Sequence, residues 1–207
     1  MHLSSSNFTD GRAIPGDFAF CVPDPDTHAT FAPNRSPALA WGAVPDGTRT
    51  FVITCHDPDV PTKPDDVNQE GREVPADLPR TDFYHWVLVD LPARVTSIVD
   101  GEFSHGVTAR GKDQRGPYGA RPGVNNYTDW FSGDPDMEGT YYGYDGPCPP
   151  WNDSLIHHYV FTVYATDLER CPVDGAFSGP DVLAAIDGHI LGQASITGTY
   201  TLNPRLM

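Results

Sequence analysis

The chain has 207 residues, a net charge of −15 and 39% hydrophobic residues, which predicts a soluble globular protein. The length suits one domain over residues 1–207, although two small domains would also fit. Because nucleic acids and anionic membrane surfaces are polyanions, the acidic charge argues against both as bulk partners. Glycine and proline together make up about a fifth of the residues, against a usual share of roughly 12%. The composition therefore favours a loop-rich, mostly β protein.

The cellular location is predicted from two features that the sequence lacks. No apolar run approaches the roughly 18 residues that span a membrane, and the first residues lack the basic flank and apolar core of a signal peptide. We therefore expect a cytoplasmic protein without stable membrane insertion.

The four cysteines (Cys21, Cys55, Cys148 and Cys171) are scattered and show no CxxC spacing, so we expect no structural zinc, other metal or cofactor. In the cytoplasm such thiols are expected to be reduced. Cys21 and Cys55 fall in apolar stretches typical of a core, whereas Cys148 lies in a proline-rich loop.

Taken in chain order, alternating and β-branched stretches predict strands over residues 17–22, 38–41, 48–56, 83–91, 157–165 and 194–202. A serine cap at Ser178 and an early proline predict one helix near the C-terminus, over residues 182–191. Residues 62–82 form a long exposed loop, and residues 101–145 are either a lid or an ordered insertion. The short links between the other strands favour antiparallel sheets packed as a sandwich.

Three core strands carry polar residues at one end. Asp57 and Asp59 follow one strand, His85 lies early in another, and His157 and Tyr159 open a third on the same face. If these ends meet, a carboxylate, two imidazoles and a phenol share one cavity. Imidazolium and phenol donate hydrogen bonds to phosphate oxygens. A carboxylate behind a histidine also raises the pKa of that histidine and keeps it charged, and we expect Asp57 to position His85 in this way.

The proline-rich loop 146–150 precedes this third strand. Proline fixes φ, and Gly146 permits a backbone path that is closed to other residues, so the loop should hold one shape and form one wall of a small concave site. Backbone N–H groups of this loop are expected to contribute further donors to a ligand. The plainer interpretation is a tight strand connection followed by surface histidines.

Each polar residue also has a structural interpretation. Asp57 and Asp59 can be ordinary turn acids, which is the interpretation we prefer for Asp59. His85 can be a hydrogen-bonded core histidine, and Tyr159 can simply pack. His158 faces the opposite side of its strand and is expected at the surface.

The ordered set of these motifs resembles the phosphatidylethanolamine-binding protein family, in particular its bacterial Raf-kinase-inhibitor-like branch. The motifs are Asp57-Pro-Asp-Val-Pro61, Tyr84-His-Trp-Val-Leu-Val89, Gly146-Pro-Cys-Pro-Pro150 and His157-x-Tyr-Val-Phe161, with supporting similarity over residues 34–48 and 187–200. The resemblance covers most of the chain. It departs from the family at His158, where the signature usually has arginine, and in the segment between Pro150 and His157.

The resemblance implies an antiparallel β-sandwich with a few short helices, long loops and a small anion pocket. The residues that match the family's pocket are Asp57, His85, Gly146, Pro147, His157 and Tyr159. The ligand implied is a small anionic or phosphorylated molecule such as a phosphoethanolamine-like head group. The long loops 62–82 and 101–145 are placed to cover or reshape such a pocket.

The function expected is therefore non-enzymatic binding of this ligand, with modulation of a kinase or another partner protein implied by the family. One alternative is a protease inhibitor that acts through loop 62–82 or loop 101–145. Another is a hydrolase with Cys148 as nucleophile, His85 or His157 as base and Asp57 as the orienting carboxylate. A homodimer is compatible with the sequence.

Overall fold

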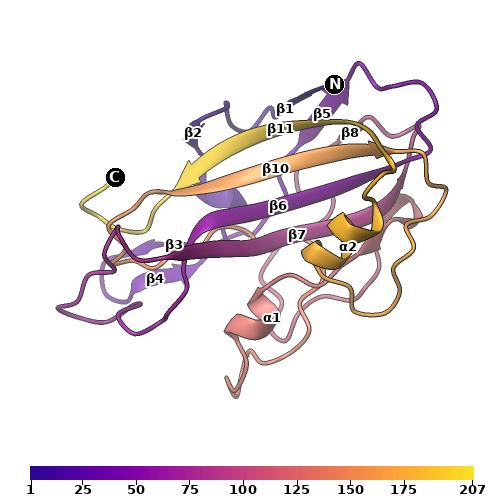
Figure 1. The fold of residues 1–207 in the computed structure, drawn as a ribbon. Coiled ribbons are helices and arrows are strands. Elements are labelled where there is room, and N and C mark those ends of the chain that lie inside the picture. The colour runs from indigo at the N-terminus through magenta and orange to yellow at the C-terminus, as the bar shows by residue number, and fades with distance from the viewer.

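The computed structural model describes residues 1–207 and consists mainly of strands that form three sheets (Figure 1). The largest has the order β2-β11-β10-β6-β7-β9, with a three-stranded sheet β1-β5-β8 and a hairpin β3-β4 beside it. The strands are β1 (His2–Ser4), β2 (Arg12–Ala13), β3 (Cys21–Asp24), β4 (His28–Phe31), β5 (Leu39–Gly42), β6 (Thr50–Pro61), β7 (Arg80–Pro92), β8 (Ser97–Ile98), β9 (Arg121–Pro122), β10 (His157–Thr166) and β11 (Ile190–Tyr200). The helices are α1 (Tyr127–Trp130) and α2 (Gly179–Ala185), with 3₁₀ turns η1 (Gly16–Phe18) and η2 (Pro117–Gly119).

The expected antiparallel sandwich is confirmed, with one parallel pairing between β2 and β11. A main core of 29 buried residues lies on one face of the large sheet, where Trp41 of β5 meets Phe51 of β6 with ring centroids 5.2 Å apart. A second core of nine residues lies on the other face, where Val182 of α2 packs with Val87 and Val89 of β7. Figure 1 shows α2 next to β7. Alternation along β6 explains the division, because Phe51 and Ile53 join the main core while Val52 joins the second.

Several predicted elements differ from the structure, including the end of loop 62–82, because β7 already begins at Arg80. The helix ends at Ala185 and Ile190 already begins β11, because the turn through Gly188, at φ +79°, interrupts it. Residues 17–22 hold a 3₁₀ turn and only the start of β3. Strand β6 continues to Pro61, so Asp57 and Asp59 lie within it and do not follow it.

The register between β6 and β7 shifts beside His85. Cys55 pairs with Trp86 and His56 pairs with Tyr84, so His85 has no partner of its own. An extra residue of this kind changes the alternation of side chains. As a result His85 lines a cavity on the same side as Trp86 of the main core, while Tyr84 packs in the second core.

Candidate functional site

Three neighbouring strands of the large sheet contribute residues to one cavity of about 510 Å³. Strand β6 contributes Asp57, β7 contributes His85, and β10 contributes Tyr159. All three are buried, so they form the floor of the cavity. Its walls come from hairpin β3-β4, helix α1, the proline-rich loop and loop 62–82.

His85 is held by the backbone. Its Nδ1 donates to the carbonyl oxygen of Asp145 at 2.8 Å, which leaves Nε2 as the nitrogen that can meet a ligand. Phe83, Tyr127 and Tyr159 surround the ring with centroids 4.8, 5.5 and 5.1 Å away. Burial lowers the pKa of His85, and the charge of Asp57 counteracts this only in part. The expectation that Asp57 orients His85 and keeps it charged is therefore wrong.

Tyr159 brings an unused hydrogen-bonding group to the same floor. Its hydroxyl is buried and has no hydrogen-bond partner in the protein. Burial, followed by the charge of Asp57, raises the pKa of Tyr159 well above its usual value, and hydrogen bonding toward the nearby Asp57 carboxylate adds to this, so the phenol keeps its proton. A buried polar atom without a partner is rare in native proteins, which makes this hydroxyl a candidate ligand contact.

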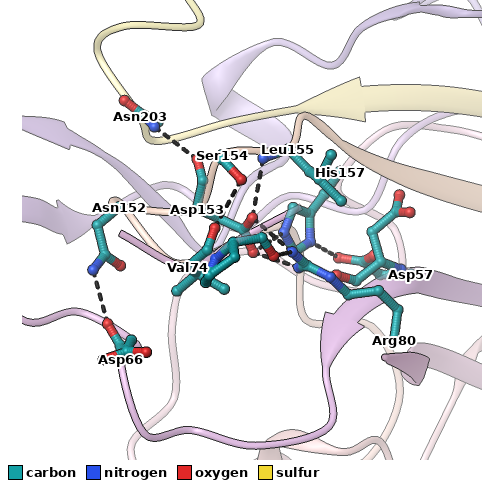
Figure 2. Close-up of polar contacts among 12 residues, drawn as sticks. Asp57, Asp66, Val74, Arg80, Asn152, Asp153, Ser154, Leu155, His157 and Asn203 are labelled. Carbon is teal, nitrogen blue, oxygen red and sulfur yellow. Dashed lines mark hydrogen bonds and ion pairs between the residues drawn. The ribbon is translucent and has the colours of Figure 1, made fainter. Parts of the chain in front are cut away.

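His157 lies behind the floor and does not line the cavity. Its Nδ1 meets Asp57 Oδ2 at 2.7 Å and its Nε2 meets Asp153 Oδ2 at 3.1 Å, so both ring nitrogens are occupied. Arg80 binds the same Asp153 carboxylate through two nitrogens at 2.6 and 3.1 Å. Figure 2 shows the His157 ring between the two carboxylates, with Arg80 beside it.

The opposite charges of Asp57, His157, Asp153 and Arg80 stabilise one another. Burial opposes protonation of His157, but the hydrogen bonds to Asp153 and Asp57 and their charges outweigh it and raise the pKa to about 9. Burial also opposes ionisation of Asp153, yet the bonds from His157 and Arg80 lower its pKa. His157 is thus an imidazolium that fixes Asp57 in place, and its role is to position the floor.

Gly146 and Pro147 also lie outside the cavity lining. A Cβ on Gly146 would lie 2.1 Å from the carbonyl oxygen of Phe18, and the Gly146 N–H donates to Asn34 at 2.8 Å. The Pro147 carbonyl accepts from Phe20 and Cys21. These residues clamp the loop to the segment before β3, so neither the occupied Gly146 N–H nor a proline offers the expected backbone donor to a ligand.

Cys148 and Cys21 form a disulfide that lies in the cavity wall. The expectation of four reduced thiols is therefore wrong for this pair, and only Cys55 and Cys171 are free and buried. Cys148 is bonded to Cys21 and so has no free thiol to act as the nucleophile of the hydrolase alternative while this bond is intact. No helix combines the length and apolar character needed to cross a membrane. The cytoplasmic location stays a prediction, and a disulfide, typical of oxidising compartments, does not support it.

Both long loops border the cavity. Loop 62–82 contributes Pro64 and Val67, and segment 101–145 contributes Tyr127 and Phe131. The first is tied down by Asn152, whose side-chain amide donates to the carbonyl oxygen of Asp66 at 2.8 Å, a contact drawn in Figure 2. The segment 101–145 is thus an ordered wall in this structure, and its one short α-helix is part of the site.

Several residues that hold the site in place were not predicted from the sequence. Asp145 is fully buried and accepts from Asn34, Asn125 and Lys112, at 2.8, 2.8 and 2.5 Å. Two weak signals of this contact are present in the sequence, since Lys112 is one of only two lysines and Asp145 directly precedes Gly146. Arg80 and Asp153 carried no signal, because their pairing joins residues 73 positions apart.

Comparisons with known proteins agree with this arrangement. The family model described as "Phosphatidylethanolamine-binding protein" matches residues 4–201. The chain belongs to the phosphatidylethanolamine-binding protein family.

Relatives within this family come from several bacteria. The chain is 34% identical to YbhB of Escherichia coli strain K12, over 97% of this chain and all of that protein. The crystal structure of E. coli YbcL, described as a member of the mammalian family, superposes with a TM-score of 0.68 at 28% identity, covering 97% of both chains. A putative family homologue from Chlamydia trachomatis gives 0.62 at 25%, covering 96% of this chain and 95% of the other. Family membership indicates a ligand-binding protein.

Proposed function

We propose that the protein is a non-enzymatic binding protein whose cavity takes a small phosphorylated or otherwise anionic ligand of the phosphoethanolamine kind. The observation that carries the proposal is the buried, unpartnered hydroxyl of Tyr159 beside His85. This hydroxyl can donate to a ligand oxygen, and His85 Nε2 can do so once protonated.

Asp57 also lies on the floor, but its negative charge is offset, so it repels an anionic ligand less than a free carboxylate would. Its two carboxylate oxygens accept from the Asp59 N–H at 2.8 Å and from His157. Because His157 carries a proton, Asp57 and His157 together are close to neutral. The floor thus presents hydrogen-bond donors to a ligand, and the negative charge of Asp57 is balanced by the positive charge of His157.

Aromatic and proline side chains make up much of the wall, including Phe20, Phe131 and Pro150. They exclude water from the floor, and a dry surrounding strengthens each hydrogen bond to an ionic ligand. The hydrolase alternative lacks a free nucleophile here, since Cys148 is in a disulfide, and one of its two candidate bases, His157, has both ring nitrogens occupied. These features support binding without chemistry.

The proposal is tested by a phosphorus NMR titration of phosphoethanolamine against the wild type, His85→Ala and Tyr159→Phe. Each variant should bind more than tenfold more weakly, because a charge-assisted hydrogen bond contributes roughly 1.5–3 kcal/mol. His158→Ala is the matched control, since its ring is exposed on the other face of β10 and its affinity should not change. Equal affinities for all four proteins would overturn the proposal.

Modulation of a kinase or of another partner protein stays a prediction from the family, and a homodimer stays compatible with the sequence. The protease-inhibitor alternative also stays open, although loop 62–82 is anchored by Asn152.

A further inference from the structure

Asp145 meets His85 through the main chain in both directions. The Asp145 N–H donates to the His85 carbonyl oxygen at 2.9 Å, and the Asp145 carbonyl oxygen accepts from His85 Nδ1 at 2.8 Å. The His85 ring is therefore held by the position of residue 145, and the same contact selects the Nδ1–H tautomer. Because the proline-rich loop 146–150 follows directly, Asp145 also joins the floor of the cavity to its wall.

The side chain of Asp145 is a fully buried carboxylate. Asn34 and Asn125 each donate to it at 2.8 Å, but both are neutral amides. The cation that pairs with it is Lys112, whose Nζ lies 2.5 Å from Oδ1 and whose side chain is only 20% exposed. A buried carboxylate is costly without such a partner, and one of the chain's two lysines lies at this position.

A close crossing of two backbone segments brings Lys112 to this carboxylate. A Cβ on Gly111 would lie 2.0 Å from the carbonyl oxygen of Thr140, and a Cβ on Gly139 would lie 2.2 Å from that of Arg110. Gly111 also has a φ of +88°, which other residues rarely adopt. The two segments can approach this closely only because both have glycine at the crossing, so the lysine is delivered by the backbone.

The ring of His85 lies in the field of this ion pair. The titratable groups around the ring are Asp57 of β6, Tyr127 of α1, Tyr159 of β10 and Asp145. Burial raises the pKa of both phenols, which keep their protons, and Asp57 is paired with an imidazolium. Burial lowers the pKa of His85, while the charge of Asp57, the bond to the Asp145 carbonyl and the charge of Asp145 oppose this. An unpaired carboxylate at residue 145 would oppose it more strongly.

We infer that Asp145 is a positioning residue for His85, and that Lys112, by supplying the counter-charge, keeps the unliganded ring neutral. The consequence for binding rests on the proposed function, since a neutral His85 must take up a proton before its Nε2 can donate to an anion. Lys112 thereby sets the pH above which the cavity releases an anionic ligand. With a neutral residue at position 112 the cavity would retain the anion to a higher pH.

An NMR titration of the His85 ring in the unliganded protein tests the inference without a ligand. Lys112→Met should raise the titration midpoint by about 1 pH unit, because the charge of Asp145 then acts alone. Lys112→Arg keeps the positive charge and should restore the wild-type midpoint. The control Lys63→Met removes the other lysine, which is exposed and outside the cavity lining, and should leave the midpoint unchanged. An unchanged midpoint in Lys112→Met would overturn the inference.

A second pair of variants decides the matter if Lys112→Met does not fold. D145N leaves the ammonium unpaired beside His85, whereas D145N/K112M removes both charges. The His85 midpoint should therefore be lower in D145N than in the double variant, and equal midpoints would overturn the inference.

The consequence for binding is measured with aminoethyl hydrogen sulfate, whose acidic group keeps one charge between pH 6 and 8. The pH at which its affinity falls should move upwards in Lys112→Met, by the same amount as the His85 midpoint. A shifted ring midpoint in a protein that binds no anion would retain the role of the ion pair and reject the proposed function. Binding whose pH dependence is the same in both proteins would overturn the control of release by Lys112.

Discussion

His157 Nδ1 and Asp57 Oδ2 lie 2.7 Å apart, and both side chains are 1% exposed. Asp153 meets the opposite nitrogen of the same ring, so an imidazolium is enclosed between two carboxylates from different parts of the chain. This pairing places Asp57 at the floor of the cavity and makes the folding stability depend on a proton.

The first prediction concerns the pH dependence of stability. The pKa of His157 is about 9 in the folded protein, against about 6.5 in an unfolded chain. Because the folded pKa is the higher one, the contribution is complete below pH about 6.5 and is lost as the pH rises through 9. Its size is on the order of 3 kcal/mol. Urea unfolding at pH 6, 7.5 and 9 should show this loss.

The matched variants for this prediction are His157→Gln and His158→Gln. The first should destabilise the protein by about 3–5 kcal/mol, because it leaves buried carboxylates without their cation. It should also remove the loss of stability between pH 6.5 and 9, whereas the exposed His158→Gln should keep it. An NMR titration in which the His157 ring changes charge near pH 6.5 would contradict the assignment.

The second prediction concerns the pH dependence of binding. Burial lowers the pKa of His85 below its usual value, so the free protein holds this ring neutral at neutral pH. An anion on Nε2 favours the protonated ring, and binding must take up a proton. Affinity should rise as the pH falls from 8 to 6, by at most about tenfold per unit. The raised pKa values of Tyr127 and Tyr159 exclude these phenols as the source.

The ligand for this measurement should not titrate itself. Aminoethyl hydrogen sulfate keeps one charge across this range, so any proton taken up comes to the protein. Calorimetry in two buffers of different ionisation enthalpy counts that proton directly. His85→Gln should bind with no proton uptake, and a wild-type count of zero would show that His85 does not meet the anion.

The third prediction concerns the Cys21–Cys148 disulfide, which closes a loop of 127 residues. Cross-linking residues so distant lowers the entropy of the unfolded chain, and the double variant C21S/C148S should lose about 3–5 kcal/mol of stability. It should also bind phosphoethanolamine more weakly, since both cysteines line the cavity. A dithiol reductant should reproduce these effects in the wild type and leave the double variant unchanged. A wild type whose unfolding midpoint does not respond to reductant would contradict the prediction.

The fourth prediction concerns Gly146. A methyl group there would meet the backbone at Phe18 and Ala19, which cannot turn aside as a side chain can. Gly146→Ala should therefore cost more than about 2 kcal/mol and weaken ligand binding, because the proline loop is displaced. Gly133→Ala adds the same group at φ +83° with no atom within 4 Å, and should cost only about 1 kcal/mol. Thermal unfolding of both variants makes the comparison, and equal losses would show that the close contact has no effect.

The sequence by itself determined the family, the strand-rich sandwich and the side of β10 on which His157 and Tyr159 lie. These features are encoded locally, in side-chain alternation and in ordered motifs, so they can be read without coordinates. The sequence also predicted that Asp57, His85 and Tyr159 share one cavity, and all three line it, although Asp57 and His85 lie within their strands and not at the strand ends.

Only the tertiary structure decided how those residues are used. The shift in register at His85, the pairing of Asp57 with His157 and the Cys21–Cys148 bond depend on contacts between residues far apart in the chain. Alternation specifies which face a side chain occupies, but not which distant group meets it or where a strand gains an extra residue. For this reason the sequence identified the polar groups, and packing determined which of them face a ligand and which hold the others in place.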